Sequence, residues 1–380
     1  MLNKLVVDNF KIHKHLEIEL KNLTLLTGLN SSGKSSVIQS LLLLRQNRLN
    51  GNLSKGLNLS GTLTKIGQGQ DALCQFAEDD NLCFSIQDGE HGGYDWTFPV
   101  GDENFGKTYI GHESNSVLPP LDINLFSKYF HYIGISRWDP RESYPLDTQI
   151  VEDARQLSSE KGQCDLVVHY LYHYGKEKPI SVPDELCCPG TVSNDLLTQV
   201  SAWEGLISKN VQVVPKQEGK AYILNYSYSM PEQLVDTQEF SAYNVGSGLT
   251  YVLPIIVALL STPKGGLVII ENPEAHLHSK GQANLMKLII AAAQYGIQII
   301  IETHSDFILN GVLINAKKYD KEQVGINKDN IIIYHFEKNL QSQLSESTPI
   351  HVGENGELEK QPKDFFEQMS LDVNSLMGIE

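Results

Sequence analysis

The chain has 380 residues, of which 41% are hydrophobic and 20% are charged. This composition is ordinary for a globular protein of two or three domains, and it excludes a long disordered tract. The formal net charge of −16 repels phosphate backbones on average, so it disfavours indiscriminate nucleic-acid binding but leaves room for a local basic groove.

The N-terminal sequence lacks the continuous apolar core and the small-residue cleavage site of a signal peptide. No apolar stretch reaches the ~20 residues that span a bilayer. Residues 251–260 are apolar, but this segment is too short and contains Pro254. We therefore expect a cytoplasmic protein with no membrane partner.

The N-terminal part predicts strands that lead into a phosphate loop. Residues 3–7 and 16–20 are strand-like, and residues 23–27 form an apolar run typical of a buried central strand. The sequence "GLNSSGKS" follows, and residues 34–47 are leucine-rich and free of Gly and Pro, which favours a helix. Strand, glycine loop and helix together are the context in which this motif binds a nucleoside triphosphate.

Each residue type in this loop has a physical role. Gly28 and Gly33 let the backbone approach phosphate closely, and Lys34 supplies charge to the β- and γ-phosphates. The hydroxyl of Ser35 is a candidate Mg²⁺ ligand. The predicted nucleotide-binding residues here are Gly28, Asn30, Ser31, Ser32, Gly33, Lys34, Ser35 and Ser36.

The middle of the chain is less regular. Residues 56–135 contain short strand-like runs separated by turn residues, which predicts a β-rich lobe beside the nucleotide. Residues 153–175 have a helical pattern, and residues 220–230 predict a strand with tyrosines at alternate positions. Sustained heptads and internal repeats are absent from the sequence, which excludes a long coiled-coil arm.

The five cysteines include no C-x-x-C pair, so a disulfide framework is disfavoured. Cys164, His169 and His173, with Cys187 and Cys188 further on, allow a zinc site, because the two histidines share one helical face. Their spacing matches no strong ligand pattern. We therefore prefer an amphipathic helix that carries two histidines.

Strand and helix patterns alternate after residue 240, which predicts a parallel α/β core. The expected strands are residues 266–271, 297–303 and 330–336, and the expected helices are residues 279–296 and 305–318. We expect this core to be built from both ends of the chain, with residues 56–240 inserted between them.

Polar residues at the ends of these strands carry the expected chemistry. Glu271 ends the first strand, where it is placed to hold Mg²⁺ opposite Ser35. His304 follows the next strand, within reach of a γ-phosphate. Position 272 is an asparagine, and an amide cannot accept a proton from an attacking water. General-base assistance of ~10²–10⁴-fold is then lost, unless Glu274 replaces it.

The sequence "NVGSGLT", residues 244–250, precedes an apolar helical pattern. Gly246, Ser247 and Gly248 at this helix start predict an anion site made of backbone N–H groups and the helix dipole.

Taken in order, GLNSSGKS, NVGSGLT, LVIIENPEAHLH and IIIETHSD resemble the motifs of ABC-type ATPase heads of the SMC, RecF and OLD (overcoming-lysogenization-defect) group. Stand-alone prokaryotic "AAA family ATPases" of this group, often found in anti-phage defence, show the same ENPEAHLH motif. Ser279 stands here where those proteins often have Pro.

The resemblance implies an α/β fold: a P-loop ABC-ATPase head with a mainly parallel core sheet, an antiparallel β subdomain and a mostly helical insertion. It divides the chain into residues 1–55 with the phosphate loop, 56–150 as a β-rich lobe, 151–240 as a helical or mixed insertion, and 241–380 with the remaining motifs.

The resemblance also implies a mechanism. Two heads would pair head-to-tail around ATP and Mg²⁺, each nucleotide lying between the phosphate loop of one chain and Ser247 of the other. The family's glutamine loop matches Gln68 or Gln70, and Gln70 is the third candidate metal ligand beside Ser35 and Glu271. The implied catalytic residues are Glu271, Asn272, Glu274 and His304. We expect Arg137 and Arg141 to brace the lobes rather than contact phosphate.

Two classes of function fit these features. The first is a slow ATPase, in which Asn272 orients water and long-lived ATP-bound dimers control a separate effector, such as a nuclease or another toxin, in anti-phage defence. The second is an ATP-clamped scaffold or sensor with little hydrolysis, and a RecF-like DNA-repair ATPase is a further alternative. OLD relatives carry a nuclease domain after the ATPase, whereas the residues after His304 resemble the ATPase tail. We therefore expect the effector in trans. Contact with DNA is possible but is not indicated by the charge.

Overall fold

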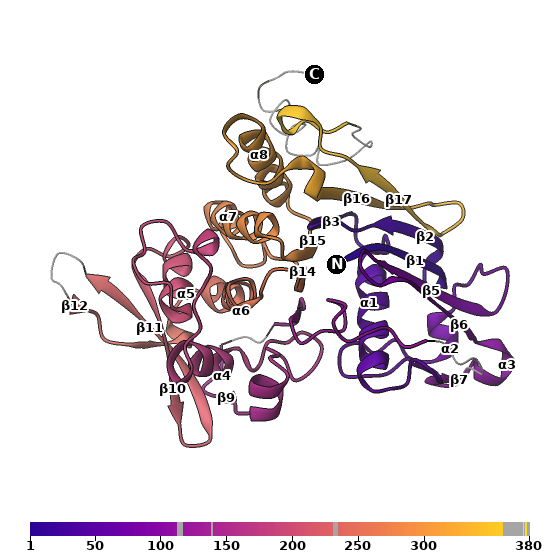
Figure 1. The fold of residues 1–380 in the computed structure, drawn as a ribbon, viewed down its shortest axis with the longest axis horizontal. Helices are drawn as coiled ribbons and strands as arrows, with labels where there is room; N and C mark the ends of the chain where they lie inside the picture. Colours follow the sequence, from indigo (N-terminus) through magenta and orange to yellow (C-terminus); the bar gives the residue numbers. More distant parts are fainter. Residues whose placement is uncertain (112–116, 138–139, 231–234, 360–374, 376, 378–380) are drawn as a thin grey trace.

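A six-stranded sheet forms the middle of the molecule in the computed structural model, which describes residues 1–111, 117–137, 140–230, 235–359, 375 and 377 (Figure 1). The strands lie in the order β17-β16-β3-β15-β14-β8, and all pairs are parallel except β16 with β17. Their bounds are β3 Leu23–Gly28, β8 Phe130–Ile133, β14 Leu267–Glu271, β15 Gln298–Glu302, β16 Ile331–Lys338 and β17 Ser345–Ile350.

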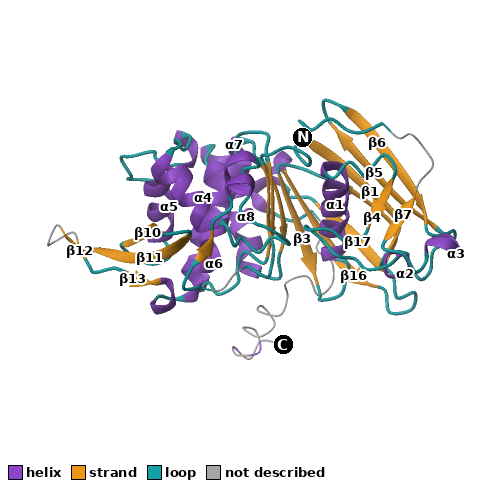
Figure 2. Cartoon of the chain, turned by 90° about the horizontal axis from the view of Figure 1, so that it is seen from below, coloured by secondary structure: helices purple, strands orange, loops and turns teal. Residues whose placement is uncertain are grey.

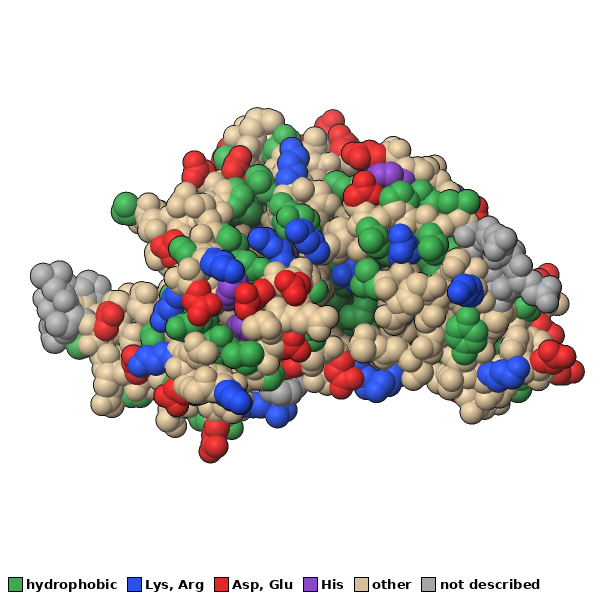
Figure 3. Space-filling model, turned by 60° about the horizontal axis from the view of Figure 1, so that its bottom comes forward, with side chains coloured by type: hydrophobic (Ala, Val, Ile, Leu, Met, Phe, Trp, Pro, Cys, Tyr) green, Lys and Arg blue, Asp and Glu red, His purple; other side chains and the backbone are tan. Residues whose placement is uncertain are grey.

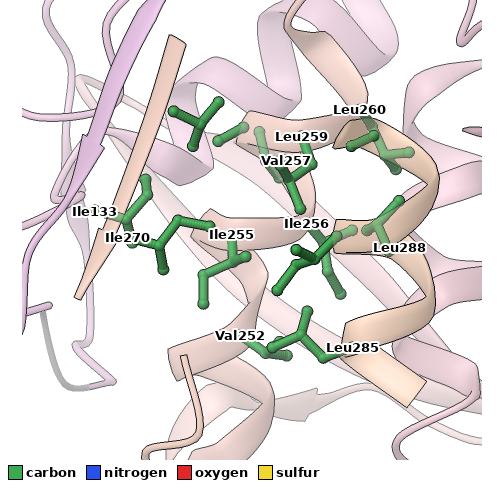
Figure 4. Packing of buried hydrophobic residues seen from close by; sticks show 14 of the residues in the cluster. Ile133, Val252, Ile255, Ile256, Val257, Leu259, Leu260, Ile270, Leu285 and Leu288 are labelled. Carbon is green, nitrogen blue, oxygen red and sulfur yellow. The ribbon is translucent and has the colours of Figure 1, made fainter. Parts of the chain in front are cut away.

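Helices cover both faces of this sheet, which explains why its strands are apolar without alternation. Helices α6 (Ser247–Ser261), α7 (Ser279–Tyr295) and α8 (Asp306–Glu322) lie on one face, and α1 (Lys34–Leu49) lies on the other (Figure 2). Val268 and Ile270 of β14 belong to the core under α6 and α7, whereas Leu267 and Ile269 belong to the core that contains α1. Figure 4 shows the side chain of Ile270 next to Ile255 of α6.

A second, antiparallel sheet packs beyond α1 in the order β2-β1-β5-β6 (Figure 2). Its strands are β1 Leu2–Phe10, β2 His13–Glu19, β5 Asn81–Asp88 and β6 Gly92–Pro99. The same lobe contains β4 Gly56–Asn58, paired with β7 Tyr109–Gly111, and the short helices α2 Gly69–Ala72 and α3 Gly101–Asn104.

The insertion forms a lobe of helices and antiparallel strands beside α6 and α7 (Figure 1). Its α-helices are α4 Val167–Tyr172 and α5 Leu196–Gly205, and its strands are β9 Tyr144–Pro145, β10 Val211–Glu218, β11 Ala221–Met230, β12 Val235–Asp236 and β13 Phe240–Ser241. Short π and 3₁₀ segments complete the description: η1 Gln149–Asp153, η2 His173–Glu177, η3 Asp184–Leu186, η4 Ala242–Asn244, η5 Lys328–Asn330 and η6 Glu354–Gly356.

The predicted α/β class, the mainly parallel core sheet and the antiparallel subdomain are confirmed. The insertion, expected to be mostly helical, contains both helices and antiparallel strands, and two local expectations are wrong. Strand β8 comes from residues expected in the inserted lobe, yet it pairs with β14 as an edge of the central sheet. The sequence did not indicate this strand, because the strand is short and its apolar run is interrupted by His131, which is buried. The helix expected over residues 153–175 begins only at Val167, since Arg155 and Cys164 have positive φ. The four-part division of the chain stays a prediction, and most residues beyond 359 lie outside the described part.

The histidines considered for zinc have other contacts. His169 stacks on Tyr222 with the ring centroids 4.6 Å apart, and His173 Nδ1 lies 2.9 Å from a carboxylate oxygen of Glu177. Among the described residues, no group of three or more His, Cys, Asp and Glu side chains is arranged to hold a metal ion. Within the same residues, no helix is both long and apolar enough to cross a bilayer.

One buried acid ties the stability of the insertion to pH. Glu204 of α5 is 0% exposed, and neither carboxylate oxygen has a hydrogen-bond partner in the described structure. Burial raises the pKa of Glu204 well above its ordinary value of 4.5. Between the unfolded and the folded pKa, the Glu204 carboxyl therefore keeps its proton in the folded protein and has lost it in the unfolded chain.

We predict that Glu204→Gln removes a pH dependence of folding. Because the pKa of Glu204 is raised in the folded state, its contribution to the free energy of unfolding is fully present below the unfolded pKa. That contribution falls by up to ~1.4 kcal/mol per pH unit as the pH rises towards the folded pKa. In urea unfolding, the stability of the variant relative to the parent should increase from pH 5 to pH 8. Glu185→Gln, at an exposed acid, is the control and should show no such trend. Equal pH profiles for parent and Glu204→Gln would contradict the prediction.

Candidate functional site

The loop between β3 and α1 has the backbone that its glycines predict. Gly28 and Gly33 have φ values of 129° and 108°, which side-chain-bearing residues rarely adopt. A Cβ atom on Gly28 would lie 2.1 Å from the carbonyl oxygen of Phe336 on the neighbouring strand β16. Glycine is therefore required at position 28 both by the turn and by this close approach.

The loop lines a cavity of about 720 Å³ at the N-terminus of α1. Residues 30–36 contribute to its wall, so all the predicted loop residues except Gly28 face this space. Lys34 is buried, and its ammonium donates hydrogen bonds to the carbonyl oxygens of Gly28 (2.9 Å) and Leu29 (2.7 Å). Backbone N–H groups, a helix N-terminus and a cation thus meet in one place, as anion binding requires.

Two side chains from distant parts of the sequence hold this loop. The Ser345 hydroxyl, at the start of β17, donates to the carbonyl oxygen of Ser32 at 2.6 Å. His13 Nε2, from β2, lies 3.0 Å from the carbonyl oxygen of Gly33. Burial lowers the pKa of His13, which keeps its ring neutral near pH 7. Sequence reasoning missed both residues, because only the tertiary fold brings them to the loop.

Two carboxylates lie side by side at the C-terminal edge of the sheet. Glu271 ends β14 and Glu302 ends β15, and the two residues are direct partners in the parallel register. The Ser35 hydroxyl donates to Glu302 Oε1 at 2.9 Å, whereas the buried Glu302 Oε2 has no hydrogen-bond partner in the described structure. Burial, followed by repulsion from Glu271, raises the pKa of Glu302 to about 7. Glu302 was not predicted, although its place at a strand end before Thr303 and His304 was a usable signal.

Glu271 is held by the neighbouring edge strand. Its Oε1 accepts a hydrogen bond from the Tyr132 hydroxyl at 3.1 Å, and its Oε2 accepts one from the backbone N–H of Ile135 at 2.9 Å. Burial raises the pKa of Glu271, and these two hydrogen bonds oppose that shift. Both contacts come from β8 and the residues that follow it, so the unexpected strand positions a predicted site residue.

Asn272 occupies a turn that favours its residue type. Its φ is 45°, in the left-handed region that Asn tolerates better than most residues. Its N–H donates to the carbonyl oxygen of Glu302, and Arg137 donates to the carbonyl oxygens of both Glu271 (2.8 Å) and Asn272 (2.9 Å). These contacts fix the end of β14 and agree with a bracing role for Arg137, whereas the expectation that Arg137 and Arg141 brace the lobes rather than contact phosphate stays a prediction.

His304 and Glu274 complete this edge. The backbone N–H of His304 donates to Glu274 Oε1 at 2.9 Å, and Glu274 Oε2 is buried without a partner in the described structure. Burial, followed by the charge of Lys34, lowers the pKa of His304. A second cavity of about 610 Å³ is lined by the predicted residues Ser35, Glu271, Asn272 and His304, and also by Glu302.

Two predicted groups lie elsewhere. Residues 246–248 start helix α6 and line neither cavity. Ser247 is exposed. Gly248 packs so closely on the loop after β14 that a Cβ atom there would lie 2.6 Å from the carbonyl oxygen of His276. Gln70 is exposed, donates to Gln68, and also lines neither cavity. The structure does not place Gln70 with Ser35 and Glu271, so its role as a metal ligand stays a prediction.

A phosphate loop, two in-register acids and a histidine at one edge of a mainly parallel sheet define a P-loop ATPase head. Two stretches of the chain match family models that agree with this class. Residues 1–90 match the model described as "AAA ATPase domain", and residues 217–310 match "AAA domain, putative AbiEii toxin, Type IV TA system". No curated protein matches the chain.

Solved structures of SMC heads share the fold. The SmcHead bound to the C-winged helix domain of ScpA has a TM-score of 0.53 and 12% identity, with 92% of this chain and 98% of that chain covered. The Smc head domain with an extended coiled coil, bound to the C-terminal domain of ScpA derived from Pyrococcus furiosus, has a TM-score of 0.50 and 11% identity, with 99% of each chain covered. The chain therefore shares the fold of these SMC heads, as its four motifs predicted.

We predict that Ser345→Ala loosens the phosphate loop. Loss of this buried hydrogen bond should weaken binding of a slowly hydrolysed ATP analogue by roughly fivefold, corresponding to ~1 kcal/mol. Calorimetric titration measures this affinity. Ser347→Ala, two residues further along β17, is the matched control and should bind as the parent does. Equal affinity of Ser345→Ala and the parent would show that the loop holds its shape without this contact.

Proposed function

We propose that this chain is a slow ATPase whose heads pair head-to-tail around ATP and thereby control a separate effector protein. The observation that carries the proposal is the position of Ser247. It starts an exposed helix N-terminus, yet it lines neither cavity at the phosphate loop of its own chain. A second copy would supply this anion-binding helix start to the nucleotide, so ATP would join two chains.

Magnesium would complete the nucleotide site, and the residues present fit this ion. Mg²⁺ prefers oxygen ligands and is commonly held by one or two carboxylates together with substrate phosphates. The Ser35 hydroxyl already contacts Glu302, whose second oxygen lacks a partner, and Glu271 lies beside Glu302 in the sheet. When bound, the ion would supply positive charge that offsets the negative charge of the nucleotide.

The chain's own residues support slow rather than fast hydrolysis. Lys34 would exchange its two carbonyl partners for phosphate oxygens, and His304 would face the γ-phosphate from the second cavity. Asn272 can orient a water through its amide but cannot take its proton. Glu274 has one oxygen free of hydrogen bonds in the described structure, and it lies directly beside His304. We assign Glu274 the role of proton acceptor, and because Glu274 lines neither cavity at the phosphate loop, we expect hydrolysis to be slow.

Exposed apolar side chains support pairing of the heads. Leu29 of the phosphate loop is 76% exposed and Ile135 is 55% exposed, and both line the cavity that contains Glu271. Tyr243, just before Ser247, is 56% exposed. Large apolar residues at the rim of a polar site favour burial against a partner. These residues fit the two complementary sides of a head-to-tail contact.

An effector in trans and a role in anti-phage defence belong to the same proposal. One matching family model carries "AbiEii toxin, Type IV TA system" in its description, which supports a toxin or nuclease as the controlled partner in the cytoplasm. Figure 3 shows acidic and basic side chains interspersed over one face of the molecule, without a broad basic surface. With a net charge of −16, this supports a protein effector over DNA as the main partner. The alternative of an ATP-clamped scaffold differs only in turnover.

We predict slow steady-state ATP hydrolysis by the purified chain, with Lys34→Ala as the blank. Glu274→Gln should reduce the rate by ~10²–10⁴-fold, because it removes the proton acceptor and keeps the side-chain size. Nucleotide occupancy measured alongside separates loss of catalysis from loss of binding. A fast rate that survives Glu274→Gln would refute the assigned role, and bound ATP without turnover would favour the scaffold.

We predict that Ser247→Arg blocks ATP-dependent pairing while each chain still binds ATP. Sedimentation velocity of Glu274→Gln protein with ATP and Mg²⁺ should show a dimer, which the added arginine converts to monomers. Val192→Arg, at a fully exposed position of the insertion, is the control and should leave the dimer intact. A dimer that persists with Ser247→Arg would exclude the head-to-tail arrangement.

A further inference from the structure

A cavity of about 800 Å³ lies between the insertion and the core helices, outside the nucleotide site. Its walls come from η3 and α5 of the insertion, from α7 and α8 of the core, and from the turns after α6 and α8. Its volume is in the range of ligand-binding pockets and is large enough for several side chains of a bound segment. The residues of this cavity take no part in the site described above.

Apolar side chains form much of its wall. Trp203 of α5 is 6% exposed, and its indole N–H donates to the carbonyl oxygen of Leu186 at 2.9 Å, which fixes the ring. Ile290 and Tyr295 of α7 and Leu206 lie in the same lining. Leu206 is 36% exposed and Val324 is 61% exposed in this lining, so apolar surface is available to an occupant.

The charged residues of the lining are mostly positive. Lys264, Lys287 and Lys318 line the cavity, whereas Glu185 is the one acid in its described lining. Lys287 donates to the amide oxygen of Asn284, and none of the three lysines forms an ion pair within the described residues. In a chain with a net charge of −16, a pocket with three exposed lysines selects a negatively charged occupant.

We propose that this cavity docks a segment of the effector protein that carries apolar side chains flanked by Asp or Glu. Its apolar side chains would contact Leu206 and Val324, and its carboxylates would pair with Lys287 and Lys318. The identity of the occupant as an effector segment rests on the proposed function, whereas the binding chemistry rests on the cavity alone.

The same helices connect this cavity to the nucleotide site. Helix α7 begins at Ser279, shortly after Glu271 and Glu274, and it contributes Lys287 and Ile290 to the cavity. Helix α8 begins at Asp306, two residues after His304, and contributes Lys318. A segment bound here therefore contacts the two helices whose N-termini adjoin the residues that would contact ATP.

A random peptide library displayed on phage and selected on the intact chain tests the proposal. Enriched sequences should combine Asp or Glu with Phe, Trp or Leu. A synthetic peptide of the enriched type should bind in fluorescence anisotropy and lose affinity on the order of tenfold with the Lys287→Glu, Lys318→Glu double variant. Leu206→Ser, at a partly exposed apolar position, should weaken it too. Lys55→Glu with Lys220→Glu makes the same charge change elsewhere and should have no effect.

Three outcomes overturn the proposal: no enrichment, enrichment of basic or neutral sequences, or binding that the double variant retains in full. Thermal unfolding confirms that each variant is folded. Peptide binding is also measured with Lys34→Ala, which abolishes turnover without touching the cavity. If the parent and Lys34→Ala both bind the peptide but the parent shows no ATPase activity, the docking site is supported and the proposed ATPase function fails. If the parent hydrolyses ATP but binds no peptide, the ATPase function is supported and the docking site fails.

Discussion

The site depends on the register of three parallel strands. Strands β3, β15 and β14 hydrogen-bond side by side, so their C-terminal ends reach one edge of the sheet together. This register places the phosphate loop, Glu302 and Glu271 next to one another, although long stretches of sequence separate them. Because the sheet is buried on both faces, a shift of β14 or β15 that moved its terminal carboxylate into the sheet would bury an unpaired charge, so the burial that stabilises the fold also fixes the site.

Support for the phosphate loop comes from outside these three strands. Ser345 and His13 reach its carbonyl oxygens from β17 and β2, and the strand β16 leaves no space for a side chain at Gly28. Elements from both ends of the chain thus enclose the loop. The loop's conformation is for this reason a property of the whole core rather than of the glycines alone. In the proposed function, phosphate oxygens replace the carbonyl oxygens that hold Lys34.

Position 272 shows how backbone geometry and chemistry meet in one residue. The chain turns sharply after β14, and a left-handed conformation there favours Asn over most other residues. Arg137 fixes this turn through two carbonyl oxygens. The asparagine thus has a structural reason to be present, and the proposal gives the role of proton acceptor to Glu274. In the proposed function, this arrangement makes bound ATP long-lived, which suits a protein that holds a partner until release.

The sequence by itself determined the phosphate loop and the alternating strands and helices of the C-terminal part. It also marked Ser35, Glu271, Asn272 and His304 as candidates for one site, and all four line one cavity. Each of these features depends on local spacing. Tertiary structure decided the rest. Strand β8, the pairing of Glu302 with Ser35, and the contacts of Ser345 and Arg137 all join residues far apart in the chain. The separation of Ser247 from its own phosphate loop belongs here too. Local patterns carry the information for turns and periodicity, whereas register and burial arise only when distant segments pack together.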